Sequence, residues 1–320
     1  MIKLRNNKYE QLNILTLMAM IMIYTIHYFN YFNKYLNSSI ELYLASILRG
    51  IALIAVLIFV AITAYSNLYL NKEVNFQKLL LYIILPTLLL TYGFHLFFKE
   101  SNVYWNTKIG FSSTWYGDMY IGLILSMSLI MFLKNKAKKM MLVVGILLTI
   151  FGYYYSIKTG NATAYDLGLL VFVPYIGLAL VLNHILFEWD FHNNTIIILL
   201  LIIGLLFQIY AYTPLNQYNR IYIISYFSPF SIMYTFGFIK LILNSNLSLK
   251  WVRKISRTSY FFYFCSYYVI KYFNNYSLAF TKNNIFLCFV IGIFLSLMLS
   301  YVFYYLYDLT LKILKINKHI

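Results

Sequence analysis

Residues 195–212 read TIIILLLIIGLLFQIYAY and hold no charged side chain in 18 consecutive positions. A helix of about 20 apolar residues crosses the roughly 30 Å hydrocarbon core of a bilayer. Comparable runs recur along the chain, and we place spans near residues 11–33, 42–65, 79–98, 116–133, 140–157, 166–186, 195–212, 221–243, 258–274 and 284–307. The sequence therefore predicts an all-α, polytopic transmembrane helix bundle of about ten spans.

Composition agrees with this fold class. Of the 320 residues, 62% are hydrophobic and only 11% are charged, whereas soluble domains have roughly 25% charged residues. No linker rich in Pro, Gly or Ser divides the chain, so we expect a single domain over residues 1–320. The formal charge of +16 sits in short loops rather than on one folded face, which excludes nucleic acid as a partner and leaves membrane lipid.

The basic residues are divided unevenly between alternate loops. We count 17 on the side that holds the N-terminus and seven on the other, and the positive-inside rule then places both termini in the cytoplasm of a multi-pass cell-membrane protein. Two basic clusters belong to the richer side: Lys134, Lys136, Lys138 and Lys139, and Lys250, Arg253, Lys254 and Arg257. Such clusters determine topology and contact anionic lipid; docking of a donor's phosphates is the alternative.

Ionisable residues inside the spans gather at one depth. At about 1.5 Å per residue, His27 lies about 22 Å up the first span, Arg49 about 10 Å down the second and His95 about 24 Å up the third. Asp118 and Asp166 begin the fourth and sixth spans on the same outer side. These positions predict a polar cavity that faces outward.

Two of these residues have both a structural and a catalytic interpretation. An intramembrane Arg costs about 2.5–3.5 kcal/mol on insertion scales, so Arg49 should pair with Asp118 or Asp166, in a reaction site or as a lock between helices. His27 either hydrogen-bonds a neighbouring helix or acts as a general base, because imidazole titrates near neutrality. His95 lies closer to the membrane interface, and this position favours a structural role.

No metal centre or nucleotide-hydrolysing site is expected. His184, Glu188 and His192 recur at a spacing of four, which suits metal binding, but they fall in a short polar loop where a solvated turn is expected. Cys265 and Cys288 lie in apolar runs without CxxC spacing, as buried small residues do. The chain also lacks a phosphate-binding GxxxxGK[ST] loop.

Several short strings follow one another in a distinctive order. They are Tyr24-Thr-Ile-His27, Leu48-Arg-Gly-Ile-Ala, Phe59-Val-Ala-Ile-Thr-Ala-Tyr65, Leu81-Tyr-Ile-Ile-Leu-Pro86, Thr114-Trp-Tyr-Gly-Asp118 and Tyr226-Phe-Ser-Pro-Phe-Ser-Ile-Met233. In order and spacing they resemble the acyltransferase 3 family of bacterial membrane proteins. The nearest branch is that of poly-N-acetylglucosamine intercellular adhesion, which is linked to biofilm and capsule polysaccharide.

The resemblance implies a reaction and a set of residues. Members carry an acyl group such as acetyl or succinyl from cytosolic acyl-CoA, the co-substrate, to a hydroxyl of an extracytoplasmic polysaccharide or its precursor. It implies His27 as the base, with Arg49 and Asp118 ordering the site. The acceptor side would comprise Trp115, Tyr116, Asp166 and His95, and the donor side Lys78 and Thr16, with Thr16 standing where the family has an Arg. A late histidine of the family is replaced near Ser266.

Two other functions are compatible with the same resemblance. The first is export of a poly-N-acetylglucosamine-type polysaccharide across the cell membrane without acyl transfer. The second is a non-catalytic partner of a membrane glycan synthase, with a membrane glycosyltransferase beside it.

Overall fold

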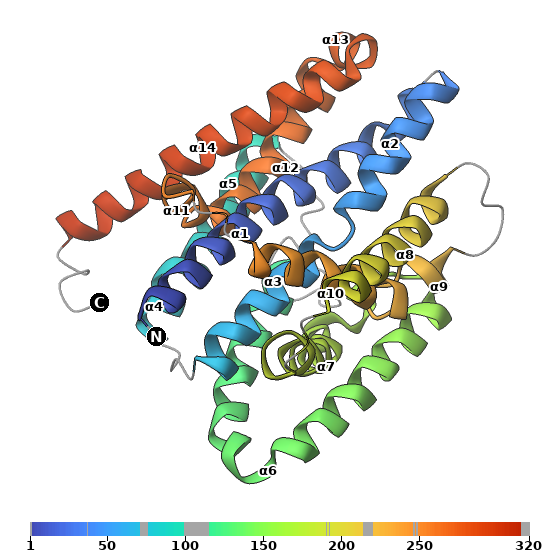
Figure 1. Cartoon of the computed structure of the whole chain (residues 1–320). Helices are drawn as coiled ribbons and strands as arrows, with labels where there is room; N and C mark the ends of the chain where they lie inside the picture. The colour runs from blue at the N-terminus through green and yellow to red at the C-terminus, as the bar shows by residue number, and fades with distance from the viewer. Residues whose placement is uncertain are drawn as a thin grey trace. The chain divides into compact units, whose positions relative to one another are not determined.

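The computed structural model describes residues 2–36, 38–70, 76–98, 115–189, 191, 193–213, 220–245, 247 and 249–314, in some helical stretches by their backbone alone. Within these ranges every regular element is a helix (Figure 1), which confirms the all-α prediction. The helices form two compact units. Unit 1 comprises Met1–Ala55 and Asn246–Ile320, and unit 2 comprises Val56–Ser245.

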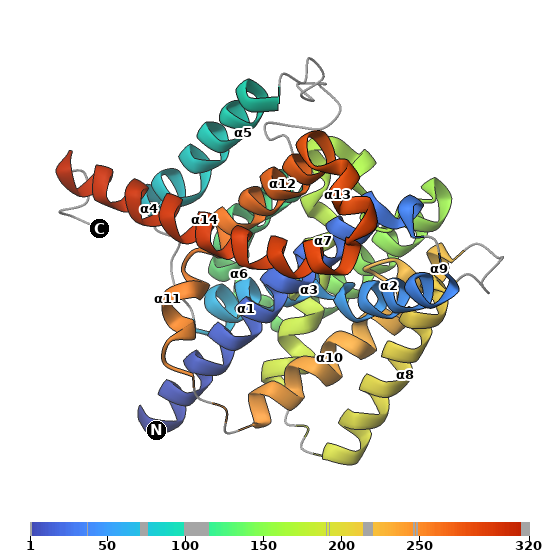
Figure 2. The same cartoon turned by 90° about the horizontal axis from the view of Figure 1, so that it is seen from above.

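Unit 1 is built around the first helix of the chain. Its helices are α1 (Ile2–Phe32), α2 (Ser39–Ala52), α11 (Val252–Ser256), α12 (Ser259–Tyr276), α13 (Leu278–Asn283) and α14 (Ile285–Ile313). Helix α1 packs against α2, α11, α12 and α14, and α12 packs along α14 (Figure 2). Residues 1–55 and 246–320, from the two ends of the sequence, therefore fold together.

Large aromatic side chains attach α1 to α14. Tyr24, Tyr28 and Phe29 are fully buried. The Tyr28 hydroxyl donates a 2.7 Å hydrogen bond to the carbonyl oxygen of Ile285, and the Tyr24 ring centroid lies 5.9 Å from that of Phe289. A β-carbon added at Gly292 would overlap the Tyr24 hydroxyl, so the glycine makes room for this ring.

These contacts also fix the directions of the helices in unit 1. Tyr24 and Tyr28 meet Phe289 and Ile285 in reverse order, so α1 and α14 are antiparallel. The beginning of α1 and the end of α14 therefore lie at the same end of unit 1. That this end is cytoplasmic stays a prediction from the basic residues.

Unit 2 holds the remaining helices. They are α3 (Ala55–Ala64), which begins at the unit boundary, α4 (Phe76–Leu79), α5 (Leu85–Phe98), α6 (Trp115–Thr159), α7 (Phe172–Asn183), α8 (Asn194–Tyr212), α9 (Ile221–Ile224) and α10 (Pro229–Asn244). Three π-helical turns extend them at Tyr65–Tyr69, Leu80–Ile84 and His184–Glu188, and a 3₁₀ turn covers Tyr165–Leu170.

Glycines let the helices of unit 2 approach closely. A β-carbon on Gly204 of α8 would lie 2.6 Å from the backbone nitrogen of Tyr234 on α10, and one on Gly237 of α10 would lie 2.6 Å from the Leu201 β-carbon. Gly145 of α6 and Gly177 of α7 face each other in the same way. Small residues at such crossings are typical of membrane helices, whose association depends on close packing rather than on the hydrophobic effect.

Helix α6 differs from the sequence prediction. Residues 134–139, which hydropathy predicts as a connection between spans at 116–133 and 140–157, are helical, and α6 contains 45 residues. A straight helix of that length would be about 68 Å long, more than twice the hydrocarbon thickness of about 30 Å. Figure 1 shows that α6 turns sharply along its course, so it is not one straight helix of that length.

Each of the ten predicted spans falls largely on helical residues, although non-helical residues interrupt three of them, at 53–54, 171 and 225–228. Of the helices in the described ranges, six are long and apolar enough to cross a membrane: Tyr9–Tyr35, Ser39–Tyr69, Met140–Thr159, Asn194–Tyr212, Ile221–Asn244 and Ile285–Ile313. Leu80–Leu90 and Phe172–Glu188 are shorter apolar helices. The chain is thus an integral membrane protein, and the number ten remains a prediction.

Candidate active site around His27

His27 lies on α1 against two tyrosines of α12. Its half-buried ring has its centroid 4.8 Å from that of Tyr267, and the Tyr267 hydroxyl oxygen lies 3.5 Å from His27 Nδ1. The Tyr263 ring, one helical turn earlier on α12, meets the imidazole edge-on at 6.1 Å. Residues four apart share one face of a helix, so α12 supports the imidazole with a two-tyrosine surface.

The contact with Tyr267 gives the two imidazole nitrogens different roles. A neutral imidazole has one protonated nitrogen and one acceptor. When Nδ1 carries the proton, it donates to the Tyr267 hydroxyl oxygen and Nε2 keeps its lone pair. His27 is then a neutral base on a partly exposed position inside the candidate span Tyr9–Tyr35.

Tyr267 is a site residue that the sequence does not single out. The family resemblance draws attention to Ser266, but the Ser266 hydroxyl is fully buried and donates to the carbonyl oxygen of Tyr263 at 2.7 Å. Its neighbour Tyr267 makes the contact with His27 instead. The abundance of tyrosine in residues 258–274 is the available signal, and it does not say which ring faces α1.

Arg49 lies on α2, which packs against α1 within unit 1. Helix α2 begins with a capping box in which the Ser38 hydroxyl accepts from Glu41 N and the Glu41 carboxylate accepts from Ser38 N. By helical rise, Arg49 is about 15 Å from this beginning, while His27 is about 7.5 Å from the end of α1. Arg49 is half-buried, and that it shares the depth of His27 stays a prediction.

Several predicted site residues fall outside the described side chains. Asp118, Trp115 and Tyr116 form the first turn of α6 in unit 2, with only their backbone described. The same holds for His95 on α5 and Lys78 on α4. Pairing of Arg49 with Asp118, sugar stacking on Trp115 and Tyr116, and the roles of His95 and Lys78 stay predictions.

Asp166 and Thr16 make local contacts. The exposed Asp166 carboxylate accepts a 2.9 Å hydrogen bond from Asn161 Nδ2, whose Oδ1 accepts from the Thr163 backbone and hydroxyl. The Thr16 hydroxyl donates to the carbonyl oxygen of Leu12 at 2.8 Å, within its own helix. Asp166 therefore orders a turn, and Thr16 supplies no cation for a donor phosphate.

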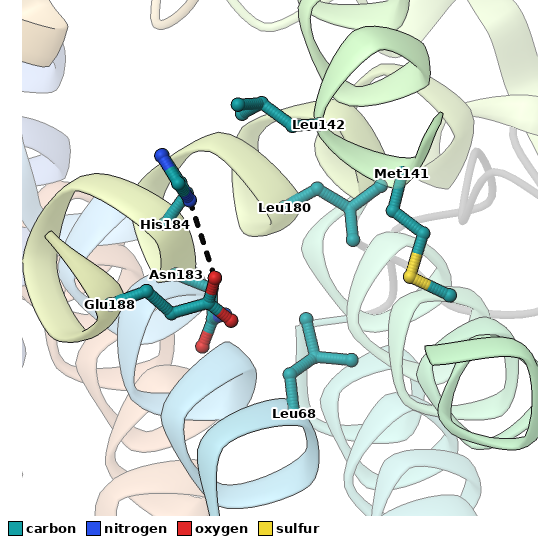
Figure 3. A pocket seen from close by; sticks show the side chains of 7 residues that line it. All are labelled: Leu68, Met141, Leu142, Leu180, Asn183, His184 and Glu188. Carbon is teal, nitrogen blue, oxygen red and sulfur yellow. Dashed lines mark hydrogen bonds and ion pairs between the residues drawn. The ribbon is translucent and has the colours of Figure 1, made fainter. Parts of the chain in front are cut away.

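A second polar cluster lies in unit 2 (Figure 3). His184 Nδ1 is 3.3 Å from a carboxylate oxygen of Glu188, and Asn183 Nδ2 donates to the other oxygen at 2.9 Å. The three side chains border a cavity of about 30 Å³ whose other walls are Leu68, Met141, Leu142 and Leu180. That volume suits a water-sized group.

The prediction of a solvated turn is wrong for this cluster. Helix α7 continues through a π-helical turn to Glu188, whose side chain is only 13% exposed. The lateral hydrogen bonds of His184 and Asn183 compensate for burial of the carboxylate. His192 lies outside the described residues, and the described part of the chain holds no group of three potential metal ligands.

Comparison with known protein families identifies the kind of domain that the chain contains. A family model described as an acyltransferase domain, Acyl_transf_3, matches residues 9–305, from the beginning of the first predicted span almost to the end of the last. The chain has no significant match among curated proteins or solved structures. The matched region includes His27, Arg49 and Tyr267.

Proposed function

The chain belongs to the acyltransferase 3 family, and on that premise we propose that it moves an acyl group from cytosolic acyl-CoA to a hydroxyl of an extracytoplasmic polysaccharide. The observation that carries this proposal is the placement of His27, which is half-buried inside a membrane-spanning helix and held at Nδ1 by Tyr267. A histidine with one supported nitrogen and one available nitrogen suits general-base catalysis.

In the proposed reaction, His27 Nε2 takes the proton of a sugar hydroxyl. The alkoxide oxygen attacks the thioester carbonyl carbon of acyl-CoA, and the new C–O bond forms as the carbonyl oxygen becomes an oxyanion. Collapse of this intermediate breaks the C–S bond. The coenzyme A thiolate leaves and takes the proton from His27, so the base is regenerated and the products are an O-acylated glycan and free coenzyme A.

Arg49 and Asp118 complete the proposal as residues that order the site. A guanidinium near a developing oxyanion stabilises it more strongly in a low-dielectric environment than in water. An acidic partner would hold the guanidinium in place, since an intramembrane Arg normally pairs with an acid. The donor would approach from the cytoplasmic side, where the basic loops are predicted.

The proposal is tested by mass spectrometry of surface glycan from a deletion strain complemented with the wild-type chain or with His27→Ala. We expect His27→Ala to abolish O-acyl ester while polymer at the surface stays at the wild-type amount. Thr25→Ala, which loses only a hydroxyl bonded to the carbonyl oxygen of Ile21 in its own helix, is the matched control and should restore the ester.

Two other results would contradict the proposal. Polymer trapped inside the deletion strain, with His27→Ala restoring its appearance at the surface, would indicate an exporter. If His27→Ala is silent and deletion reduces the amount of a membrane glycan synthase, the chain is a non-catalytic partner.

A further inference from the structure

Beyond His27, two tyrosine rings near the end of α1 contact lysine ammonium groups. Tyr31 lies one helical turn beyond His27, and Lys271 Nζ on α12 is 5.4 Å from its ring centroid. Tyr35 lies another turn further, with Lys282 Nζ at 4.5 Å and Lys34 Nζ at 5.0 Å from its centroid. Three elements of unit 1 thus contribute cations to two rings.

The contacts form one strip rather than separate pairs. Helices α1 and α12 are parallel, because His27 meets Tyr267 and Tyr31 meets Lys271 one turn later on both helices. The strip extends about 12 Å from His27, through the end of α1 at Phe32, to Tyr35 in the 3₁₀ turn Asn33–Tyr35. It leads toward α13, at the end of unit 1 away from the beginning of α1 (Figure 1).

The outer part of the strip is accessible and positively charged. Lys34 and Lys282 are exposed, whereas Tyr31, Tyr35 and Lys271 are half-buried. Lys34 and Lys282 approach the same ring, so two like charges are brought within about 10 Å of each other, where they repel. In the part of the chain that the structure describes, neither Lys34 nor Lys282 forms an ion pair.

The chemistry of the strip matches a negatively charged sugar chain. Aromatic faces offer apolar surface to the C–H faces of sugar rings, and ammonium groups bind carboxylate or phosphate oxygens through charge-assisted hydrogen bonds. An anionic group between Lys34 and Lys282 would also remove their mutual repulsion. A neutral polymer would contact only the rings of Tyr31 and Tyr35.

We propose that the acceptor is an anionic glycan, with carboxylate or phosphate groups, that binds along Tyr35, Tyr31 and their lysines and presents a hydroxyl to His27. This inference rests on the proposed acyltransferase function and narrows its acceptor. It departs from an uncharged poly-N-acetylglucosamine acceptor, which the family branch implies.

The test compares binding of two matched probes to the full chain in phosphatidylcholine nanodiscs. One is a neutral N-acetylglucosamine hexamer and the other is the same hexamer carrying C6 carboxylates. We expect the carboxylated hexamer to bind at least about tenfold more tightly at low ionic strength, with the difference shrinking as salt screens the lysines. The double variant Lys34→Gln/Lys282→Gln should lose most of this preference.

The double variant Lys250→Gln/Lys254→Gln is the matched control. It removes two exposed lysines next to and within α11, elsewhere in unit 1, and should keep the preference. Both double variants remove exposed side chains, and equal melting temperatures would show that each folds.

Three results would overturn the inference. They are equal affinity for the two hexamers, an equal loss in the control variant, or, in nanodiscs that also contain phosphatidylglycerol, loss only of bound phosphatidylglycerol counted by native mass spectrometry. The last result would mean that the lysines face lipid. Acyl transfer to the carboxylated acceptor at an unchanged rate in Lys34→Gln/Lys282→Gln would also overturn it while the acyltransferase stands. Charge-selective binding with no acyl transfer would contradict the proposed function instead.

Discussion

At the scale of single residues, His27 is positioned by a tyrosine that lies 240 positions later in the chain. The depth of His27 follows from helical rise and the hydropathy pattern, so the sequence predicts it. The residues that contact His27 cannot be predicted in this way. Hydropathy reports the transfer of a segment into lipid and carries no information on which faces of two helices meet. Tyr267 is therefore found only in the structure.

Tyr267→Phe should lower kcat about 2- to 12-fold with little change in KM for either substrate. The variant keeps the ring that packs on His27 and removes the hydroxyl 3.5 Å from Nδ1. A hydrogen bond is worth about 0.5–1.5 kcal/mol, and this range corresponds to the stated loss. Steady-state kinetics of the purified chain with acyl-CoA and a glycan acceptor provide the measurement.

The control for that experiment is Tyr272→Phe, on the exposed part of α12, where the ring lies tilted against that of Tyr276 at 5.6 Å between centroids. It should leave both kinetic constants unchanged. If the two variants behave alike, or if only KM changes in Tyr267→Phe, Tyr267 does not orient the base.

At the scale of secondary structure, the match between apolar runs and helices is close. The run 195–212 becomes α8 (Asn194–Tyr212), and 221–243 becomes α9 and α10 within Ile221–Asn244. Hydropathy does not predict where a helix continues through a polar segment or where its backbone hydrogen bonding changes. A π-helical turn carries α7 to Glu188, and α6 is helical through 134–139, because hydropathy does not distinguish a helix that bends or widens from one that ends.

Gly237→Val should destabilise unit 2 by about 1–3 kcal/mol, the usual cost of overpacking. The new side chain would begin 2.6 Å from the Leu201 β-carbon and 2.9 Å from the Ile197 carbonyl oxygen, so α8 and α10 must separate. Thermal unfolding in detergent, followed by circular dichroism, should show a lower midpoint.

Leu206→Val, on the exposed side of α8, is the comparison for the glycine variant. It changes a side chain that faces away from α10 and should leave the midpoint within error. A Gly237→Val midpoint equal to that of Leu206→Val would show that the close approach of the two helices contributes little to stability.

At the scale of the whole molecule, topology is open to direct measurement. The charge bias predicts that the beginning of α2 faces outward and α11 faces the cytoplasm. A cysteine at Ser39 should therefore react with a membrane-impermeant thiol reagent in intact cells, and one at Lys254 should react only after lysis. Both native cysteines, Cys265 and Cys288, are buried, so the wild-type chain gives a low background. The reverse labelling pattern would invert the assignment of sides.

The central place of α1 also has a consequence for biosynthesis. Helix α1 ends at Phe32, but α12 begins at Ser259, roughly 230 residues later, and at about 5–20 residues per second the ribosome needs roughly ten to fifty seconds to make that stretch. During this interval α12 and α14, two of the helices that pack against α1, have not yet been made. A truncated chain therefore lacks the residues that surround His27. The order of synthesis thus delays assembly of the reaction centre until nearly the entire polypeptide has been made.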